Sequence, residues 1–81
     1  MPTRPDVKYY DIKDYGEAMR AVDIIEARKG WAILHYQQFG RERDHYEIWA
    51  AGHSRDHEDT LDKAQIFMES TIRDFMRGNS V

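Results

Sequence analysis

Apolar and aromatic positions along the chain gather into two runs in its middle, over residues 31–39 and 45–51. A charged segment, residues 40–44, separates the two runs. Both runs are rich in β-branched and aromatic residues and are bounded by glycines, a pattern that is typical of a β-hairpin. The middle of the chain therefore predicts two antiparallel strands joined by a polar turn.

Helical spacing of apolar residues predicts one helix on each side of this hairpin. The first is expected over residues 14–29, with Asp14 as its N-cap, Glu17 completing a capping box and Gly30 as its left-handed stop. Its predicted buried stripe consists of Tyr15, Ala18, Met19, Val22 and Ile25. The second helix is expected from residue 58 or 59 to residue 77, with a stripe of Leu61, Ala64, Met68, Thr71, Ile72 and Phe75.

The remaining segments give weaker patterns. Residues 7–12 can form a short strand, while residues 53–59 are polar and resemble a loop that enters the second helix. Residues 1–6 and 79–81 are expected to be flexible. The whole chain, residues 1–81, is expected to form a single domain.

Two registers of the hairpin are possible, and they assign side chains to its faces differently. Pairing Phe39 with His45 places Tyr36 opposite Ile48 and gathers one apolar face. Pairing Phe39 with Tyr46 leaves both faces mixed, so the first register is favoured. Both helices then pack on the face that carries Tyr36 and Ile48. The predicted fold class is α+β, in the order (β)-α-β-β-α, with an antiparallel hairpin covered on one face by two helices.

The opposite face of the hairpin interleaves aromatic and polar side chains, and uncovered aromatics often mark a contact surface. In the alternative interpretation, residues 7–12 fold over this face within one chain. We predict that the face binds a partner. The predicted partner-binding residues are Trp31, His35, Gln37, Phe39, Arg41, Arg43, His45, Glu47 and Trp49.

Composition narrows the possible functions. The 81 residues contain no cysteine, which excludes disulfides and thiolate chemistry, and their formal net charge is −3. A general nucleic-acid binder would be basic, so this class is disfavoured. The longest apolar run is far short of the ~20 residues that a membrane span requires. We therefore expect a cytoplasmic protein that does not bind membranes.

Two alternatives use particular side chains. Single-stranded nucleic acid could stack on Trp31, Phe39 and Trp49, with Arg41 and Arg43 contacting phosphates. Two groups of metal-ligand residue types also occur: His35, His45 and Glu47 in the hairpin, and His53 and His57 beyond it. The hairpin group lacks the ligand spacing of a known metal motif. His53 and His57 would have a ligand-compatible spacing of one turn if the second helix began early, but residues 53–59 resemble a solvated helix entry, so we expect no metal and no cofactor.

No catalytic motif is present in the sequence. Gly52, His53 and Ser54 begin like a nucleophile elbow, but Asp56 stands where that motif requires a second glycine. We therefore predict a non-catalytic protein-binding module that forms a symmetric homodimer. Its small size and lack of motifs further suggest an accessory protein of a phage or mobile element, which inhibits by occupying a partner's surface.

Overall fold

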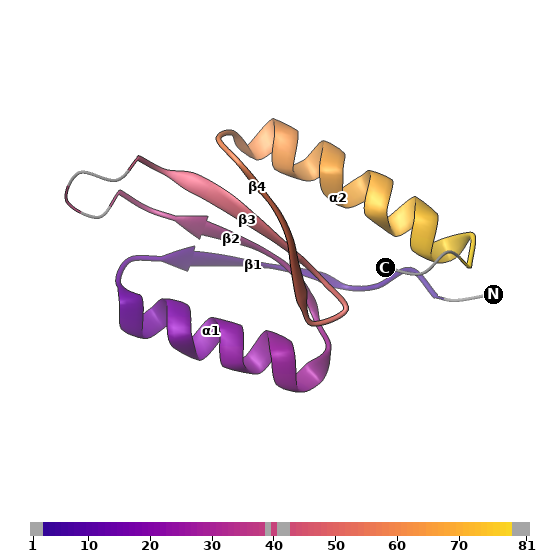
Figure 1. Ribbon diagram of the computed structural model, residues 1–81, viewed down its shortest axis with the longest axis horizontal. Coiled ribbons are helices and arrows are strands. Elements are labelled where there is room, and N and C mark those ends of the chain that lie inside the picture. The colour runs from indigo at the N-terminus through magenta and orange to yellow at the C-terminus, as the bar shows by residue number, and fades with distance from the viewer. Residues whose placement is uncertain (1–2, 39, 41–42, 79–81) are drawn as a thin grey trace.

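The computed structural model describes residues 3–38, 40 and 43–78. Within this part of the chain, four strands and two helices follow one another (Figure 1). Their bounds are β1 (Val7–Ile12), α1 (Tyr15–Arg28), β2 (Trp31–Tyr36), β3 (His45–Ala50), β4 (His53–Glu58) and α2 (Leu61–Met76). The predicted α+β class is confirmed. Neither described helix is long and apolar enough to cross a membrane.

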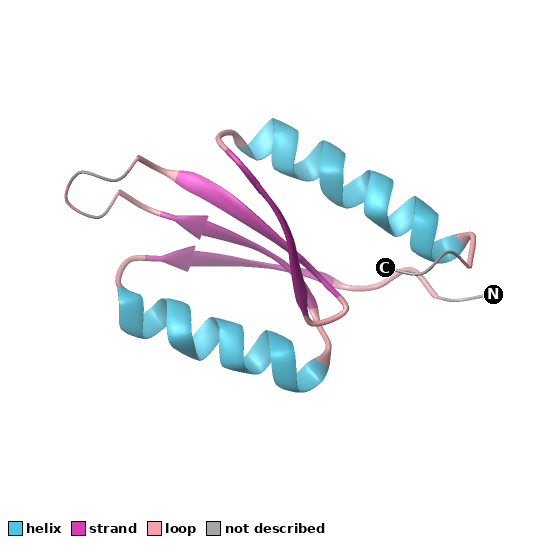
Figure 2. Cartoon of the chain, viewed as in Figure 1, coloured by secondary structure: helices cyan, strands magenta, loops and turns pink. Residues whose placement is uncertain are grey.

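The strands form one mixed sheet in the order β1-β2-β3-β4, which is also their order along the chain (Figure 2). β1 and β2 are parallel, because α1 carries the chain back between them, and the other neighbouring pairs are antiparallel. The predicted strand over residues 7–12 is therefore present. It forms one edge of the sheet, and β4 forms the other.

The two helices lie on opposite faces of the sheet, which we name the α1 face and the α2 face (Figure 1). On the α1 face the buried residues are Ile12, Ala21, Ile25, Ala32, Leu34 and Trp49. On the α2 face they are Trp31, Ile33, Ile48, Ala50, Ala64, Met68 and Ile72. The prediction that both helices share one face is thus corrected. β2 is apolar on both of its sides, so each side requires a helix to cover it.

The register of β2 and β3 also differs from the favoured prediction. Tyr36 pairs with His45 and Ile33 pairs with Ile48, whereas Tyr36 was expected opposite Ile48. The connection between the strands is therefore longer than the predicted turn at residues 40–44. The rejected register has the wrong partners, but it assigns side chains to the correct faces, because apolar residues are needed on both.

Residues 53–58, predicted to be a loop, instead form β4. The chain reverses through Ala51 and Gly52, which both have positive φ (52° and 81°), as a two-residue type I′ hairpin turn requires. The register shifts between Ile48 and Trp49, which leaves Arg55 as an extra residue in β4. A polar strand is compatible with this position, because an edge strand has little to bury and charged side chains protect it from aggregation.

The helix ends are close to their predicted positions. The Asp14 side chain accepts a hydrogen bond from the Glu17 backbone N–H, which confirms the predicted N-cap. Lys29, not Gly30, adopts the left-handed conformation that ends α1. The second helix begins later than predicted, because Thr60 caps it through the Lys63 N–H.

The predicted stripe of α1 is only partly buried. Ile25 lies in the core as predicted, but Tyr15 is 65% exposed and Met19 is 68% exposed. Ala21, which is not part of the predicted stripe, is also buried. The buried face of α1 is therefore narrower than the predicted stripe and is shifted toward Ala21. On α2, Ala64, Met68 and Ile72 are buried as expected, whereas Leu61 is exposed.

Candidate functional site

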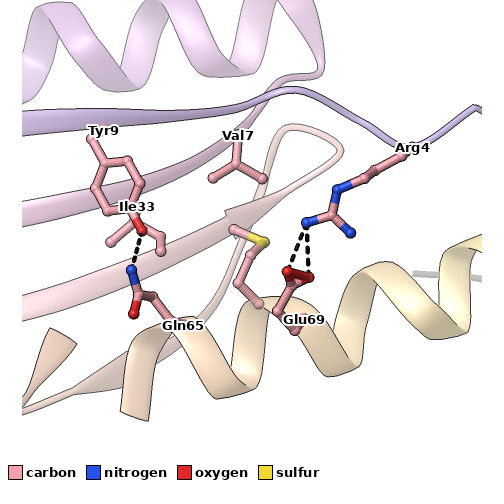
Figure 3. Close-up of a pocket in the computed structure, with 7 residues that line it drawn as sticks. Arg4, Val7, Tyr9, Ile33, Gln65 and Glu69 are labelled. Carbon is pink, nitrogen blue, oxygen red and sulfur yellow. Dashed lines mark hydrogen bonds and ion pairs between the residues drawn. The ribbon is translucent and has the colours of Figure 1, made fainter. Parts of the chain in front are cut away.

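A cavity of about 330 Å³ opens between β1 and α2 on the α2 face of the sheet (Figure 3). It exists because α2 lies over β3 and β4, which leaves space beside the edge strand β1. Val7, Ile33 and Met68 contribute apolar surface, and the other lining side chains are polar. The complete lining consists of Arg4, Val7, Tyr9, Ile33, Gln65, Met68 and Glu69.

Two polar bridges join β1 and the segment before it to α2 across this cavity (Figure 3). One Arg4 guanidinium nitrogen donates to both carboxylate oxygens of Glu69, at 2.7 and 2.9 Å. Gln65 Nε2 donates to the Tyr9 hydroxyl at 2.9 Å. The Arg4 bridge was not anticipated by the prediction that residues 1–6 are flexible.

The charges at the cavity rim neutralise each other. The hydrogen bond to Glu69 raises the pKa of Arg4, and the same bond lowers the pKa of Glu69. Both side chains are therefore ionised at neutral pH and paired. A ligand in the cavity would meet an apolar floor and a rim without net charge.

A second polar cluster lies on the α1 face, around Glu47 of β3. Glu47 Oε1 accepts a 2.9 Å hydrogen bond from the Tyr36 hydroxyl, and Oε2 accepts one of 3.1 Å from the Ser54 hydroxyl. His57 Nε2 lies 3.2 Å from the same Oε2. Because the Glu47 side chain is only 12% exposed, these three partners compensate for the loss of water around its charge.

The Glu47 cluster is a satisfied network. Burial, together with the Glu47 carboxylate, raises the pKa of Tyr36 well above its ordinary value. The Ser54 hydroxyl donates its proton to a carboxylate, whereas a nucleophilic serine donates it to a histidine that acts as base. This arrangement stabilises the sheet and has no activated nucleophile.

The histidines are divided between the two faces of the sheet. On the α1 face the His45 ring stacks on Tyr36 with centroids 4.7 Å apart, and it lies 5.8 Å from the His57 ring. His35 lies on the α2 face, where it stacks on Tyr46 at 4.6 Å. The prediction that His35, His45 and Glu47 share one face is thus corrected.

The His35 ring nitrogens contact two carboxylates. Nδ1 lies 3.1 Å from Asp11, and Nε2 lies 3.4 Å from Asp44. Across the residues that the structure describes, no group of three or more His, Cys, Asp or Glu side chains is arranged to hold a metal ion.

The nine predicted partner-binding residues do not meet on one surface. Trp31 and Trp49 are each 7% exposed and lie in the cores on opposite faces. The face that was expected to be open does not exist as predicted, because its β2 residues lie on the α2 face and its β3 residues lie on the α1 face. His35, Gln37, His45 and Glu47 are half-buried, and Arg43 is exposed. Phe39 and Arg41 lie outside the described residues.

The cavity residues were missed, because they come from segments whose patterns were weak. Val7 and Tyr9 point to one face of β1, whereas Tyr10 and Ile12 point to the other. Apolar residues on both faces of residues 7–12 are the signal for a strand that contacts two layers. Gln65 and Glu69 lie four residues apart, one helical turn, on the flank of α2 nearest β1.

Comparison with known proteins identifies no relative of this chain. No protein-family model matches the chain, and neither a curated protein nor a solved structure matches it.

Proposed function

We propose that this chain is a non-catalytic module that binds another protein. The observation that supports the proposal is the cavity between β1 and α2, which opens at the surface, has apolar side chains in its floor and lies beside an edge strand. Apolar pockets with a few polar groups at their rim are the usual form of binding sites. The hydroxyl and carboxylate groups of the cavity and of the Glu47 cluster form hydrogen bonds with other side chains of the protein. This pairing supports binding over catalysis.

The two alternative functions have less support. Nucleic-acid binding depended on Trp31 and Trp49 as stacking surfaces, and both indole rings are buried. Metal binding in the hairpin required His35 beside His45 and Glu47, but His35 lies on the opposite face of the sheet from these two. His53 and His57 also lie on opposite faces, because their partners in β3 are Ala50 and Glu47.

We expect the protein to act in the cytoplasm, to form a symmetric homodimer, and to inhibit its partner by occupying a surface of it, as an accessory protein of a phage or mobile element would. Light scattering over a wide concentration range tests the homodimer: a mass that stays at one chain throughout contradicts it.

Quantitative affinity capture from the native host tests the binding function. The full chain carries a tag, and its captured proteins are compared with those of Val7→Arg in the cavity, His45→Ala beside the Glu47 cluster, and Asp74→Ala on exposed α2 surface. We expect one protein to be captured by the wild type and by Asp74→Ala, and to be lost with Val7→Arg or with His45→Ala. Capture of no protein above the tag alone, or capture unaffected by every variant, contradicts the proposal.

A further inference from the structure

We propose that the outer edge of β1 and the adjoining cavity bind an extended peptide segment of the partner, which adds to the sheet as a further strand and inserts an apolar side chain into the cavity. This inference rests on the proposed protein-binding function and names the chemistry of the partner. Strand addition gains affinity from main-chain hydrogen bonds and specificity from pockets that receive alternate side chains.

The first argument comes from the direction of the backbone groups of β1. The Gln37 N–H donates a 3.0 Å hydrogen bond to the Ile12 carbonyl, which therefore points toward β2. Within a strand, the N–H and C=O of one residue point to the same side, and those of the next residue point to the other. Tyr10 and Lys8 consequently face β2 with Ile12, whereas Val7, Tyr9 and Asp11 direct their backbone groups outward.

These outward groups are available to a new strand. β1 is the first strand in the order of the sheet, so no described strand pairs with its outer side. It is six residues long and regular in its pairing with β2. Edge strands of this kind are templates for pairing with another chain, because their backbone donors and acceptors are otherwise met only by water.

The second argument concerns the side chains of an added strand. Directly opposed residues of neighbouring strands have side chains on the same face of a sheet. Tyr9 pairs with Ile33, which belongs to the core under α2, so Val7 and Tyr9 point to the α2 face. Peptide residues opposite Val7 and Tyr9 would place their side chains on that face, next to the cavity.

The chemistry of the cavity favours an apolar side chain. Val7, Ile33 and Met68 supply apolar surface, while the Arg4 and Glu69 charges at the rim are already paired. A charged group of the partner would lose water without gaining an unpaired counter-charge. The volume of about 330 Å³ lies within the range of ligand pockets, roughly 300–1,000 Å³.

Selection from a displayed library of random short peptides, with the full chain as bait, supplies the probe. We expect enrichment of sequences with a large apolar residue that has β-branched or aromatic residues at alternate positions. NMR spectra of the isotope-labelled full chain with an enriched synthetic peptide should then show shifted amides, with slowed exchange at Val7, Tyr9 and Asp11. These are the outward N–H groups identified above.

Two matched pairs of variants separate the backbone from the cavity. Tyr9→Pro removes an outward N–H that β2 does not use, whereas Tyr9→Ala keeps it. We expect Tyr9→Pro to bind about 2- to 13-fold more weakly than Tyr9→Ala, which corresponds to the loss of one main-chain hydrogen bond. Val7→Trp fills the cavity, whereas Lys8→Trp places the same ring on the α1 face. Only Val7→Trp should weaken binding. Circular dichroism verifies that each variant is folded.

The outcomes distinguish this inference from the proposed function. Binding that maps to β1 and fails in Tyr9→Pro and Val7→Trp supports the peptide site. A library without binders, or binders that shift amides elsewhere and tolerate both variants, overturns it. A concentration-dependent dimer that Val7→Trp abolishes also overturns it, because a second copy then occupies the edge. If affinity capture is lost with His45→Ala but not with Val7→Arg, the binding function stands and the peptide site fails.

Discussion

The turn between β3 and β4 packs against the end of α1, and a single methyl group there should disrupt both. Gly52 has a φ of +81°, and its N–H donates a 2.9 Å hydrogen bond to the Gly30 carbonyl. A Cβ atom added at Gly52 would lie 2.9 Å from the Cα atom of Lys29. Since this neighbour is backbone, it cannot rotate away as a flexible side chain would.

Gly52→Ala therefore adds two separate costs to the folded state. The left-handed backbone conformation costs an alanine about 1 kcal/mol. The overlap with the Lys29 backbone forces the turn and the helix end apart, for which overpacking of a core gives a scale of about 1–3 kcal/mol. We expect a total loss of about 2–4 kcal/mol from a free energy of unfolding that is roughly 4–12 kcal/mol for a domain of this size.

Two control variants isolate the steric cost. Gly78 has a similar φ of +87° and Gly40 has a φ of +57°, and an added Cβ at either meets no heavy atom within 4 Å in the described structure. Gly78→Ala and Gly40→Ala should therefore each lose only about 1 kcal/mol. Gly40 lies inside the chain, so it also shows whether fraying at the end of α2 reduces the effect at Gly78.

Urea unfolding followed by tryptophan fluorescence measures these differences. Trp31 and Trp49 are buried on opposite faces, so their emission reports both layers of the core. In thermal unfolding, each kcal/mol of lost stability lowers the melting temperature by about 4–8 °C. The reasoning is refuted if Gly52→Ala unfolds at the same urea concentration as Gly78→Ala and Gly40→Ala.

Three further predictions follow from caps and titrating groups. Asp14→Ala removes the N-cap of α1 and should destabilise the protein by about 1 kcal/mol in urea unfolding, with Asp14→Asn restoring most of the loss. The pKa of Tyr36 is raised in the folded state, so its stabilising effect is complete below the ordinary tyrosine pKa of 10.0 and is lost as pH rises through the folded value. Tyr36→Phe should remove this alkaline loss of stability, whereas an unchanged alkaline transition would contradict the assignment. A hydrogen bond to Asp56 raises the pKa of Glu58, because the protonated Glu58 carboxyl donates to the Asp56 carboxylate; the pair is therefore favoured below the ordinary pKa of 4.5 and repels once both carboxylates ionise. Glu58→Gln should therefore raise the melting temperature at neutral pH but not in acid, and equal shifts at both pH values would argue against the pair.

The helices could be predicted from the sequence because their signals are local. Asp14 accepts the Glu17 N–H as its position before the apolar stripe implies, and the stripe of α2 correctly includes Ala64, Met68 and Ile72. The observed helix ends differ from the predicted ends by one to three residues, because neighbouring residues compete as caps. Thr60, rather than the acidic residues before it, caps α2.

The strands were predicted less well because their pairing is not local. β2 is buried on both faces, so its apolar residues do not alternate and cannot determine a register. The favoured register gathered one clean apolar face, although Trp31 and Ile33 required a second one. β4 was missed because it is a polar edge strand, and its pairing with β3 depends on a turn whose residues, Ala51 and Gly52, are not the usual asparagine and glycine.

The position of the candidate site follows from how far a helix reaches across a sheet. A helix is about 10 Å wide with its side chains, and neighbouring strands are about 4.8 Å apart, so one helix covers about two strands. In a sheet of four described strands, each face therefore keeps an uncovered half. α1 connects β1 to β2 and lies against β1, while α2 follows β4 and lies over β3 and β4 (Figure 1).

The two uncovered halves are consequently diagonal to each other, and they differ in chemistry. On the α1 face, the half near β4 is filled by the Glu47 network, whose polar atoms pair with one another. On the α2 face, the half near β1 exposes apolar surface, with Tyr9 54% exposed beside the cavity. Only the second half combines unburied apolar surface with an unpaired strand edge. A partner strand that pairs with β1 would cover the apolar surface on this half of the α2 face. The half around Glu47 requires no such cover, because its polar groups are already paired.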